Sequence, residues 1–277
     1  MLKAISTHVH LKERLHPGIL ERLAKGGIDG IELFAMSGHF DYDHPQQTRE
    51  IASWFASAEG VELVSMHAPI YAAGESERDS APLNIAGRER RERIEAMDEI
   101  KRALERAEVL RFRFLVLHLG VSADEFSEHK FEGALSSVEH LHAFARPLGV
   151  RLLLENIPNE LTTPERLAEL IHTLHFDDIG VCLDLGHAHL SPGVEESIEM
   201  LRPWIRSVHV HDNRGDRDSH LWPGEGTIDF KRTMELLRGL PQPPMLVIES
   251  AGDPAGNPEY GKVVAGKMLE TWKKLEL

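Results

Sequence analysis

The sequence predicts an α/β protein that folds as a single (β/α)8 barrel. Short apolar runs rich in β-branched residues alternate with stretches of helical periodicity, and we count eight of each. This alternation is typical of parallel strands joined by crossover helices. The chain has 277 residues without a low-complexity linker or a break in composition, and one such barrel needs about 250 residues. We therefore expect one barrel domain over residues 1–277.

The eight predicted strands are short and mostly lack polar/apolar alternation, as expected for strands that are buried on both faces. In chain order they are "LKAISTH" (2–8), "GIELF" (30–34), "VELVSMH" (61–67), "RFLVLHLG" (113–120), "VRLLLEN" (150–156), "IGVCLDLG" (179–186), "RSVHVHD" (206–212) and "PMLVIES" (244–250). An open doubly wound sheet is the alternative, but no Gly-x-Gly-x-x-Gly loop follows the first strand. The closed barrel is therefore preferred.

The connecting segments carry helix signals of three kinds. Residues 17–27 begin with a proline and end with two glycines, which is the usual asymmetry of helix ends. Residues 87–110 place acidic and basic side chains at helical spacing. Residues 163–174 begin with a threonine that can cap a helix and a proline that suits its first position. These signals support helices between the strands.

The charge balance and the single cysteine narrow the function classes. The chain has 31 Lys and Arg against 45 Asp and Glu, a net charge of −14, which argues against non-specific attraction to nucleic acid or anionic lipid. Cys182 has no partner for an internal disulfide, so we expect a small buried side chain. The first residues lack a signal-peptide core, and no run approaches the ~20 apolar residues that span a bilayer. We therefore expect a cytoplasmic protein without a membrane partner.

Polar residues stand at the carboxyl ends of the predicted strands, where barrel enzymes build their sites. They are His67, His118, Glu155, Asp184, His209, His211 and Glu249, with His187 close behind the sixth strand and Asp218 and His220 in the loop after the seventh. Carboxylates that converge without a cation repel one another, whereas a divalent metal neutralises them. Mixed imidazole and carboxylate ligands suit Zn²⁺, Mn²⁺, Fe²⁺ or Co²⁺ better than Ca²⁺. The sequence therefore predicts a divalent-metal site.

In order and spacing, the motifs around these residues resemble those of the xylose isomerase-like TIM barrels. This superfamily includes sugar isomerases and epimerases and the endonuclease IV type of abasic-site nuclease. The matching motifs are "SMHAP", "VLHLG", "LLLEN", "CLDLGHAH", "VHVHDNRGDRDSHLWPGEGTIDF" and "VIES", and the resemblance covers essentially the whole chain. It implies a TIM-barrel enzyme with a divalent-metal cofactor, which is Zn²⁺, Mn²⁺, Co²⁺ or Mg²⁺.

The isomerase and epimerase pattern implies a specific set of site residues. The metal would be held by Glu155, Asp184, His209 and Glu249, with His187 and Arg214 reaching toward substrate oxygens. His209 is preferred to His211 because the ligand histidine of the family stands three residues before an acidic residue, here Asp212. The resemblance implies that Glu155 and Glu249 are the catalytic pair. They would move a proton of a ketose-like sugar or polyol through an enediolate.

The nuclease pattern is the alternative interpretation. It implies metal binding at nine positions, all of which this sequence fills: His67, His118, Glu155, Asp184, His187, His209, Asp218, His220 and Glu249. One zinc takes about four ligands, so either several ions bind or the surplus residues contact substrate and move protons. The loop at residues 35–47 is acidic and has no arginine to grip DNA, which together with the negative net charge favours small-molecule chemistry.

Trp222 lies in the loop after the seventh strand, so we place it at the barrel mouth. An aromatic side chain there packs against a sugar ring or against a partner subunit. Homo-oligomerisation therefore stays open. Isomerase, epimerase and dehydratase chemistry share the same machinery, so the sequence does not choose among them.

Overall fold

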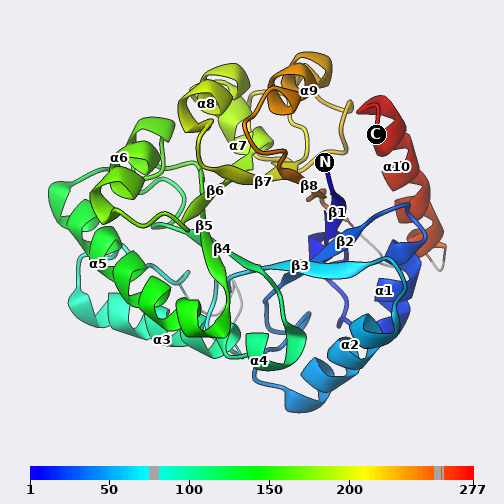
Figure 1. Cartoon of the computed structure of the whole chain (residues 1–277), viewed down its shortest axis with the longest axis horizontal. Helices are drawn as coiled ribbons and strands as arrows, with labels where there is room; N and C mark the ends of the chain where they lie inside the picture. The colour runs from blue at the N-terminus through cyan, green and yellow to red at the C-terminus, as the bar shows by residue number, and fades with distance from the viewer. Residues whose placement is uncertain (75–80, 253–256, 258) are drawn as a thin grey trace.

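The computed structural model describes residues 1–74, 81–252, 257 and 259–277. Its strands form a closed parallel barrel in which β1 to β8 follow one another in chain order, and helices surround the barrel (Figure 1). The strands are β1 (Lys3–Ser6), β2 (Gly30–Phe34), β3 (Glu62–His67), β4 (Phe114–His118), β5 (Arg151–Glu155), β6 (Gly180–Asp184), β7 (Ile205–Val210) and β8 (Met245–Ile248). The predicted (β/α)8 barrel is confirmed.

The described residues contain ten α-helices and two 3-10 helices, rather than eight helices. They are η1 (Thr7–His10), α1 (Pro17–Ala24), α2 (Pro45–Ser57), α3 (Arg90–Leu104), α4 (Ala107–Leu110), α5 (Glu128–Ala145), η2 (Arg146–Leu148), α6 (Pro164–Leu174), α7 (Leu185–Leu190), α8 (Val194–Leu201), α9 (Phe230–Arg238) and α10 (Tyr260–Lys274). Two connections hold two α-helices each: α3 with α4, and α7 with α8. Within the described ranges, no helix is both long enough and apolar enough to cross a membrane.

Six of the predicted strands end one or two residues earlier than expected, and in two of them, β1 and β6, a side chain at the strand end caps the helix that follows. Ser6 closes β1, and its hydroxyl accepts the backbone N–H of His8 at the start of η1. Asp184 closes β6, and its carboxylate accepts the backbone N–H of His187 at 2.7 Å in the first turn of α7. Such capping satisfies N–H groups that a helix leaves unpaired. It also fixes the Asp184 carboxylate at the strand end.

The predicted helix over residues 87–110 is divided into α3 and α4, whereas the predicted helix start at residue 163 is correct. The Thr163 hydroxyl accepts the backbone N–H of Arg166, and Pro164 occupies the first helical position of α6. Proline suits this position because its missing N–H would be unpaired in any case. The local signals therefore predicted where α6 begins but not the division of the longer segment.

The barrel interior is layered. A cluster of buried apolar side chains is formed by Ala4, Val64, Val116, Leu153, Cys182, Met245 and Val247. Side chains on one face of a strand repeat every two residues, so Glu155, Asp184 and Glu249 follow Leu153, Cys182 and Val247 into the next layer toward the carboxyl ends of the strands. Cys182 is fully buried, as predicted. The fold thus places a layer of ionisable groups directly on an apolar one.

Candidate metal centre and active site

The polar strand ends converge as the sequence predicts. His118 pairs with Glu155 across β4 and β5, and Asp184 pairs with His209 across β6 and β7. Three groups have ligand atoms within 4.8 Å of one another: a central cluster (Glu155, Asp184, His209, Glu249), a second cluster (His67, His118, Glu155) and an outer cluster (His187, His211, Asp218, His220). These clusters contain all nine residues of the nuclease pattern and, in addition, His211.

The central cluster surrounds one ring nitrogen. His209 Nδ1 lies 3.2 Å from Glu249 Oε2, 3.3 Å from Glu155 Oε1 and 3.8 Å from Asp184 Oδ2. All four side chains are at most 4 % exposed. A single nitrogen can donate one hydrogen, so it does not satisfy three buried carboxylates. The geometry is that of a ligand set around a cation.

The second cluster shares Glu155 with the central one. His67 Nε2 and His118 Nε2 lie 3.3 Å and 3.1 Å from Glu155 Oε2. On the other side of its ring, His67 Nδ1 donates to the carbonyl oxygen of Ala68 at 2.8 Å. When His67 is neutral, its Nε2 lone pair therefore points at a carboxylate. Two lone pairs that face each other need a proton or a metal between them.

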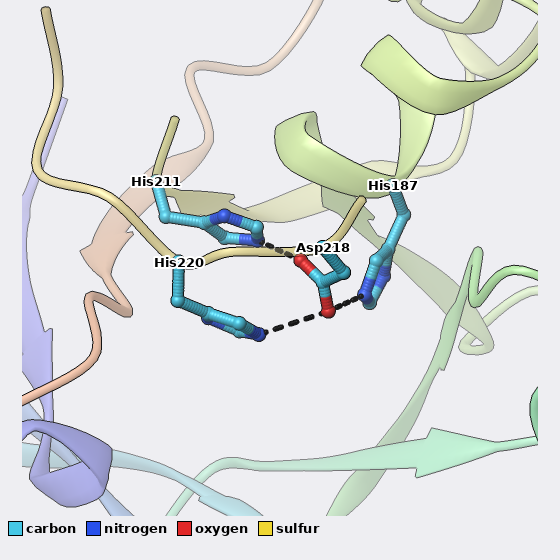
Figure 2. Close-up of side chains that lie close together, drawn as sticks. All are labelled: His187, His211, Asp218 and His220. Carbon is cyan, nitrogen blue, oxygen red and sulfur yellow. Dashed lines mark hydrogen bonds and ion pairs between the residues drawn. The ribbon is translucent and has the colours of Figure 1, made fainter. Parts of the chain in front are cut away.

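The outer cluster is drawn in Figure 2, where three imidazoles point at Asp218. His187 Nε2 and His220 Nε2 each lie 3.1 Å from Asp218 Oδ2, and His211 Nε2 lies 3.8 Å from Oδ1. The His220 Nδ1 donates to the carbonyl oxygen of Glu249 at 2.7 Å, so the same arrangement of opposed lone pairs recurs. Three imidazoles and one carboxylate are a suitable ligand set for zinc.

Protons balance these carboxylates when no metal is bound. Burial alone lowers the pKa of His187, but Asp184 and Asp218 outweigh it and raise that pKa to about 9. Burial also acts to lower the pKa of His220, but the hydrogen bond to the Asp218 carboxylate raises that pKa to about 10. Burial acts to raise the pKa of Glu155, but His209 and His118 hold it well below its usual value. The clusters thus favour positive charge, and a metal ion would displace these protons.

The donor set therefore fits a divalent metal on structural grounds. His187 Nδ1 is buried without a hydrogen-bond partner among the described residues, while Asp184 Oδ1 and Glu155 Oε1 lie 3.5 Å and 3.7 Å from it. Buried polar atoms are normally paired. A cation held by the clusters would be the missing partner of this nitrogen, which lies beside two anionic side chains.

The family relationship rests on a match over most of the chain. A family model described as xylose isomerase-like TIM barrel matches residues 20–271. The chain belongs to the xylose isomerase-like TIM barrel family. A Methanocaldococcus jannaschii protein described as uncharacterized is 29 % identical over 256 residues, which cover 89 % of this family member and 82 % of that protein. The inosose isomerase of Bacillus subtilis is 24 % identical over 192 residues, which cover 65 % of this chain and 67 % of the isomerase.

Solved structures of the xylose isomerase-like family share the whole barrel. A D-tagatose 3-epimerase-like protein superposes with a TM-score of 0.79 at 26 % identity, covering 100 % of this chain and 98 % of that one. The IOLI protein with a binding zinc atom superposes with a TM-score of 0.75 at 22 % identity, covering 100 % of this chain and 96 % of that one. At 22 % identity, the similarity to the IOLI protein shows a shared fold and no more.

Two predicted substrate-binding residues lie outside the clusters of this xylose isomerase-like barrel. Arg214 is exposed in the loop after β7. Trp222 follows β7 in the same loop, and its side chain is buried and packs in the hydrophobic core. The ammonium group of Lys267, on α10, lies over its ring at 5.4 Å. Roles of Arg214 and Trp222 in substrate binding stay predictions.

Sequence reasoning missed Glu32 as a residue of the site, and it preferred His209 to His211 as the metal ligand. Glu32 on β2 is fully buried, with Oε1 at 3.2 Å from His209 Nε2. His211 Nε2 lies 2.9 Å from both carboxylate oxygens of Asp184, so it joins the central and outer clusters. The His8 ring lies 4.9 Å from the His220 ring. The available signal for Glu32 was a single carboxylate within the apolar run "GIELF".

Proposed function

We propose that the chain is a divalent-metal-dependent isomerase or epimerase of a ketose-like sugar or polyol. The observation that carries the proposal is the meeting of Glu155 and Glu249. Glu155 ends β5 and Glu249 directly follows β8, and these strands are not neighbours in the barrel, yet each residue places an oxygen within 3.3 Å of His209 Nδ1. Two carboxylates that flank one point can remove a proton from a substrate carbon and return one to it.

The proposed mechanism assigns a role to each side chain around that point. A bound divalent ion would polarise the substrate carbonyl and make the neighbouring C–H group more acidic. One of Glu155 and Glu249 then removes the proton from carbon, and the other delivers a proton to the opposite face. His118 is 24 % exposed, and burial lowers its pKa, so it offers a neutral imidazole to a substrate hydroxyl. Proton exchange with water restores the starting state.

The known relatives support a sugar or polyol substrate for this chain. The Bacillus subtilis relative is an inosose isomerase, and the structural relative is D-tagatose 3-epimerase-like. The zinc atom in the IOLI structure supports a divalent metal at a barrel of this kind. Carbonyl chemistry on polyhydroxylated substrates is common to the two named activities, and it is the chemistry that paired glutamates beside a metal provide.

A multi-zinc phosphodiesterase acting on abasic-site DNA is the second candidate. The observation that favours it is the number of ligands, because the three clusters together contain ten residues, more than one zinc ion uses. The net charge of −14 opposes it, since proteins that grip DNA draw affinity from clustered Lys and Arg. The surplus histidines and Asp218 therefore serve substrate binding and proton transfer in the favoured proposal.

Metal content and isotope exchange test the proposal together. We expect elemental analysis of protein purified without chelator to give about one divalent ion per chain, as the four central ligands can hold one. Incubation with D-tagatose or an inosose in D₂O should place deuterium next to the carbonyl, as seen by NMR. Glu249→Gln should reduce this exchange by orders of magnitude. Glu99→Gln is a matched control, because Glu99 is also buried but contacts Tyr42, Arg102 and the backbone N–H of Ala73.

Either of two results would contradict the proposal. The first is a metal-loaded chain that exchanges no deuterium into any member of a panel of ketoses and inososes. The second is a content of two or three zinc ions together with cleavage of abasic-site DNA, which would establish the phosphodiesterase instead.

A further inference from the structure

Glu32 is a carboxylate that is fully buried inside the barrel. It lies on β2, which faces the interior of the closed barrel. Burying a carboxylate in such surroundings costs several kcal/mol unless hydrogen bonds or charges compensate. Its presence therefore needs a reason in the contacts that it makes.

Two side chains from other strands contact Glu32. The hydroxyl of Ser65 on β3 donates to Glu32 Oε2 at 2.8 Å. His209 Nε2 on β7 lies 3.2 Å from Oε1 and 3.4 Å from Oε2. Strands β2 and β7 are not neighbours in the barrel, so this contact crosses the interior. Oε2 therefore accepts from the Ser65 hydroxyl and also bonds to His209 Nε2, whereas Oε1 lies nearer to that nitrogen but has no hydrogen-bond partner among the described residues.

The contact determines which nitrogen of His209 is available to the central cluster. A carboxylate accepts hydrogen bonds and does not donate them, so Nε2 carries the hydrogen that faces Glu32. In the neutral ring, Nδ1 then carries the lone pair, and it faces the oxygens of Glu155, Asp184 and Glu249 at 3.2–3.8 Å. The opposite tautomer would place a lone pair against Glu32 and a hydrogen where a metal ion would bind.

We propose that Glu32 is a positioning residue, which locks His209 in the tautomer and orientation that present Nδ1 to a divalent metal in the central cluster. The inference rests on the metal centre of the proposed function and adds a residue from beneath the ligand layer. A carboxylate behind a ligand histidine also makes the imidazole a stronger donor to a metal, and loss of such a partner typically weakens metal affinity by about 10–100-fold.

Zinc titration of the metal-free 277-residue chain tests this role. Zinc affinity is measured by competition with a chromophoric chelator for the wild type, Glu32→Gln and Glu32→Leu. Glu32→Gln keeps the shape and a neutral acceptor, so we expect about 10-fold weaker binding at the central cluster, and Glu32→Leu should approach about 100-fold. Glu99→Gln is the matched control because it removes a buried carboxylate that does not contact His209, and it should bind zinc as the wild type does.

A second measurement distinguishes positioning from general stability. In zinc-loaded protein with ¹⁵N-labelled histidine, the Nε2–H of His209 should give a ring proton signal protected from exchange with water. This signal should shift in Glu32→Gln because a charged acceptor becomes neutral. Should Glu32→Leu fail to fold, Glu32→Gln and the ring proton signal still decide the matter.

The possible outcomes distinguish a failure of the role proposed for Glu32 from a failure of the metal centre itself. Wild-type zinc affinity and an unshifted ring signal in Glu32→Gln would overturn the role of Glu32 but leave the metal centre intact. A wild-type chain that binds no zinc at the central cluster would overturn both the metal centre and the role of Glu32. Weaker zinc binding in Glu32→Gln but not in Glu99→Gln, with a shifted ring signal, would support the positioning role.

Discussion

The close packing of Gly186 against His211 makes Gly186→Ala a strong test of the site geometry. Gly186 lies in the first turn of α7. A methyl group there would lie 1.9 Å from Cε1, 2.5 Å from Nδ1 and 2.7 Å from Nε2 of His211. The His211 ring is fully buried, and its Nε2 lies 2.9 Å from Asp184. The added methyl group would therefore force the ring away from this carboxylate.

The structure sets the size and sign of the effect. Overfilling a packed site costs about 1–3 kcal/mol, and loss of a hydrogen bond to a charged carboxylate costs about 1.5–3 kcal/mol. Replacing glycine by alanine within a helix recovers about 1 kcal/mol. We therefore expect Gly186→Ala to lower the free energy of unfolding by roughly 1.5–5 kcal/mol, although the same change in an open helix is stabilising.

A double-mutant cycle measures this coupling. Urea unfolding, followed by circular dichroism at pH 7, compares the wild type, Gly186→Ala, His211→Ala and the double variant. In the His211→Ala background the methyl group meets no ring, so Gly186→Ala should cost nothing or stabilise by up to about 1 kcal/mol. Equal destabilisation in both backgrounds would refute the packing and, with it, the placement of His211 between the two clusters.

Three further perturbations test the metal centre and the loops around it. Asp184→Asn should lower the zinc content measured by elemental analysis, because it removes a charged ligand; unchanged content would exclude Asp184 from the ligand set. Chelator treatment should lower the melting temperature, and zinc should restore it, since a metal that binds only the folded chain stabilises it; equal melting curves would contradict a bound metal. Burial opposes ionisation of Asp124, but Lys130 and the backbone N–H of Val121 keep its pKa below the ordinary 3.8. The ionised carboxylate of Asp124 therefore stabilises the fold above pH 3.8. Asp124→Asn should cost about 1–2 kcal/mol at pH 7, and in urea titrations this difference should shrink as the pH falls below about 4; a difference that is independent of pH would contradict the ion pair.

Local sequence patterns predicted the architecture and the position of the site. Eight buried runs separated by helical segments are sufficient to indicate a barrel. In a parallel barrel all strands present their carboxyl ends at one rim, so His118, Glu155 and Asp184 had to converge once each was placed at a strand end. The signal for the helix start at Thr163 was also local, because a capping side chain bonds to a backbone N–H only three residues away.

Closure of the barrel decided what these patterns could not. Glu32 and His209 are 177 residues apart and meet only because β2 and β7 face one interior. His209 and His211 are two residues apart at the end of β7, and only the packing of the finished barrel placed His209 in the central cluster and His211 in the outer cluster. The sequence determined which chemical groups reach the rim, because strand periodicity is local. The tertiary structure decided which of them share a ligand set, because distances between strands depend on how the whole sheet closes and packs.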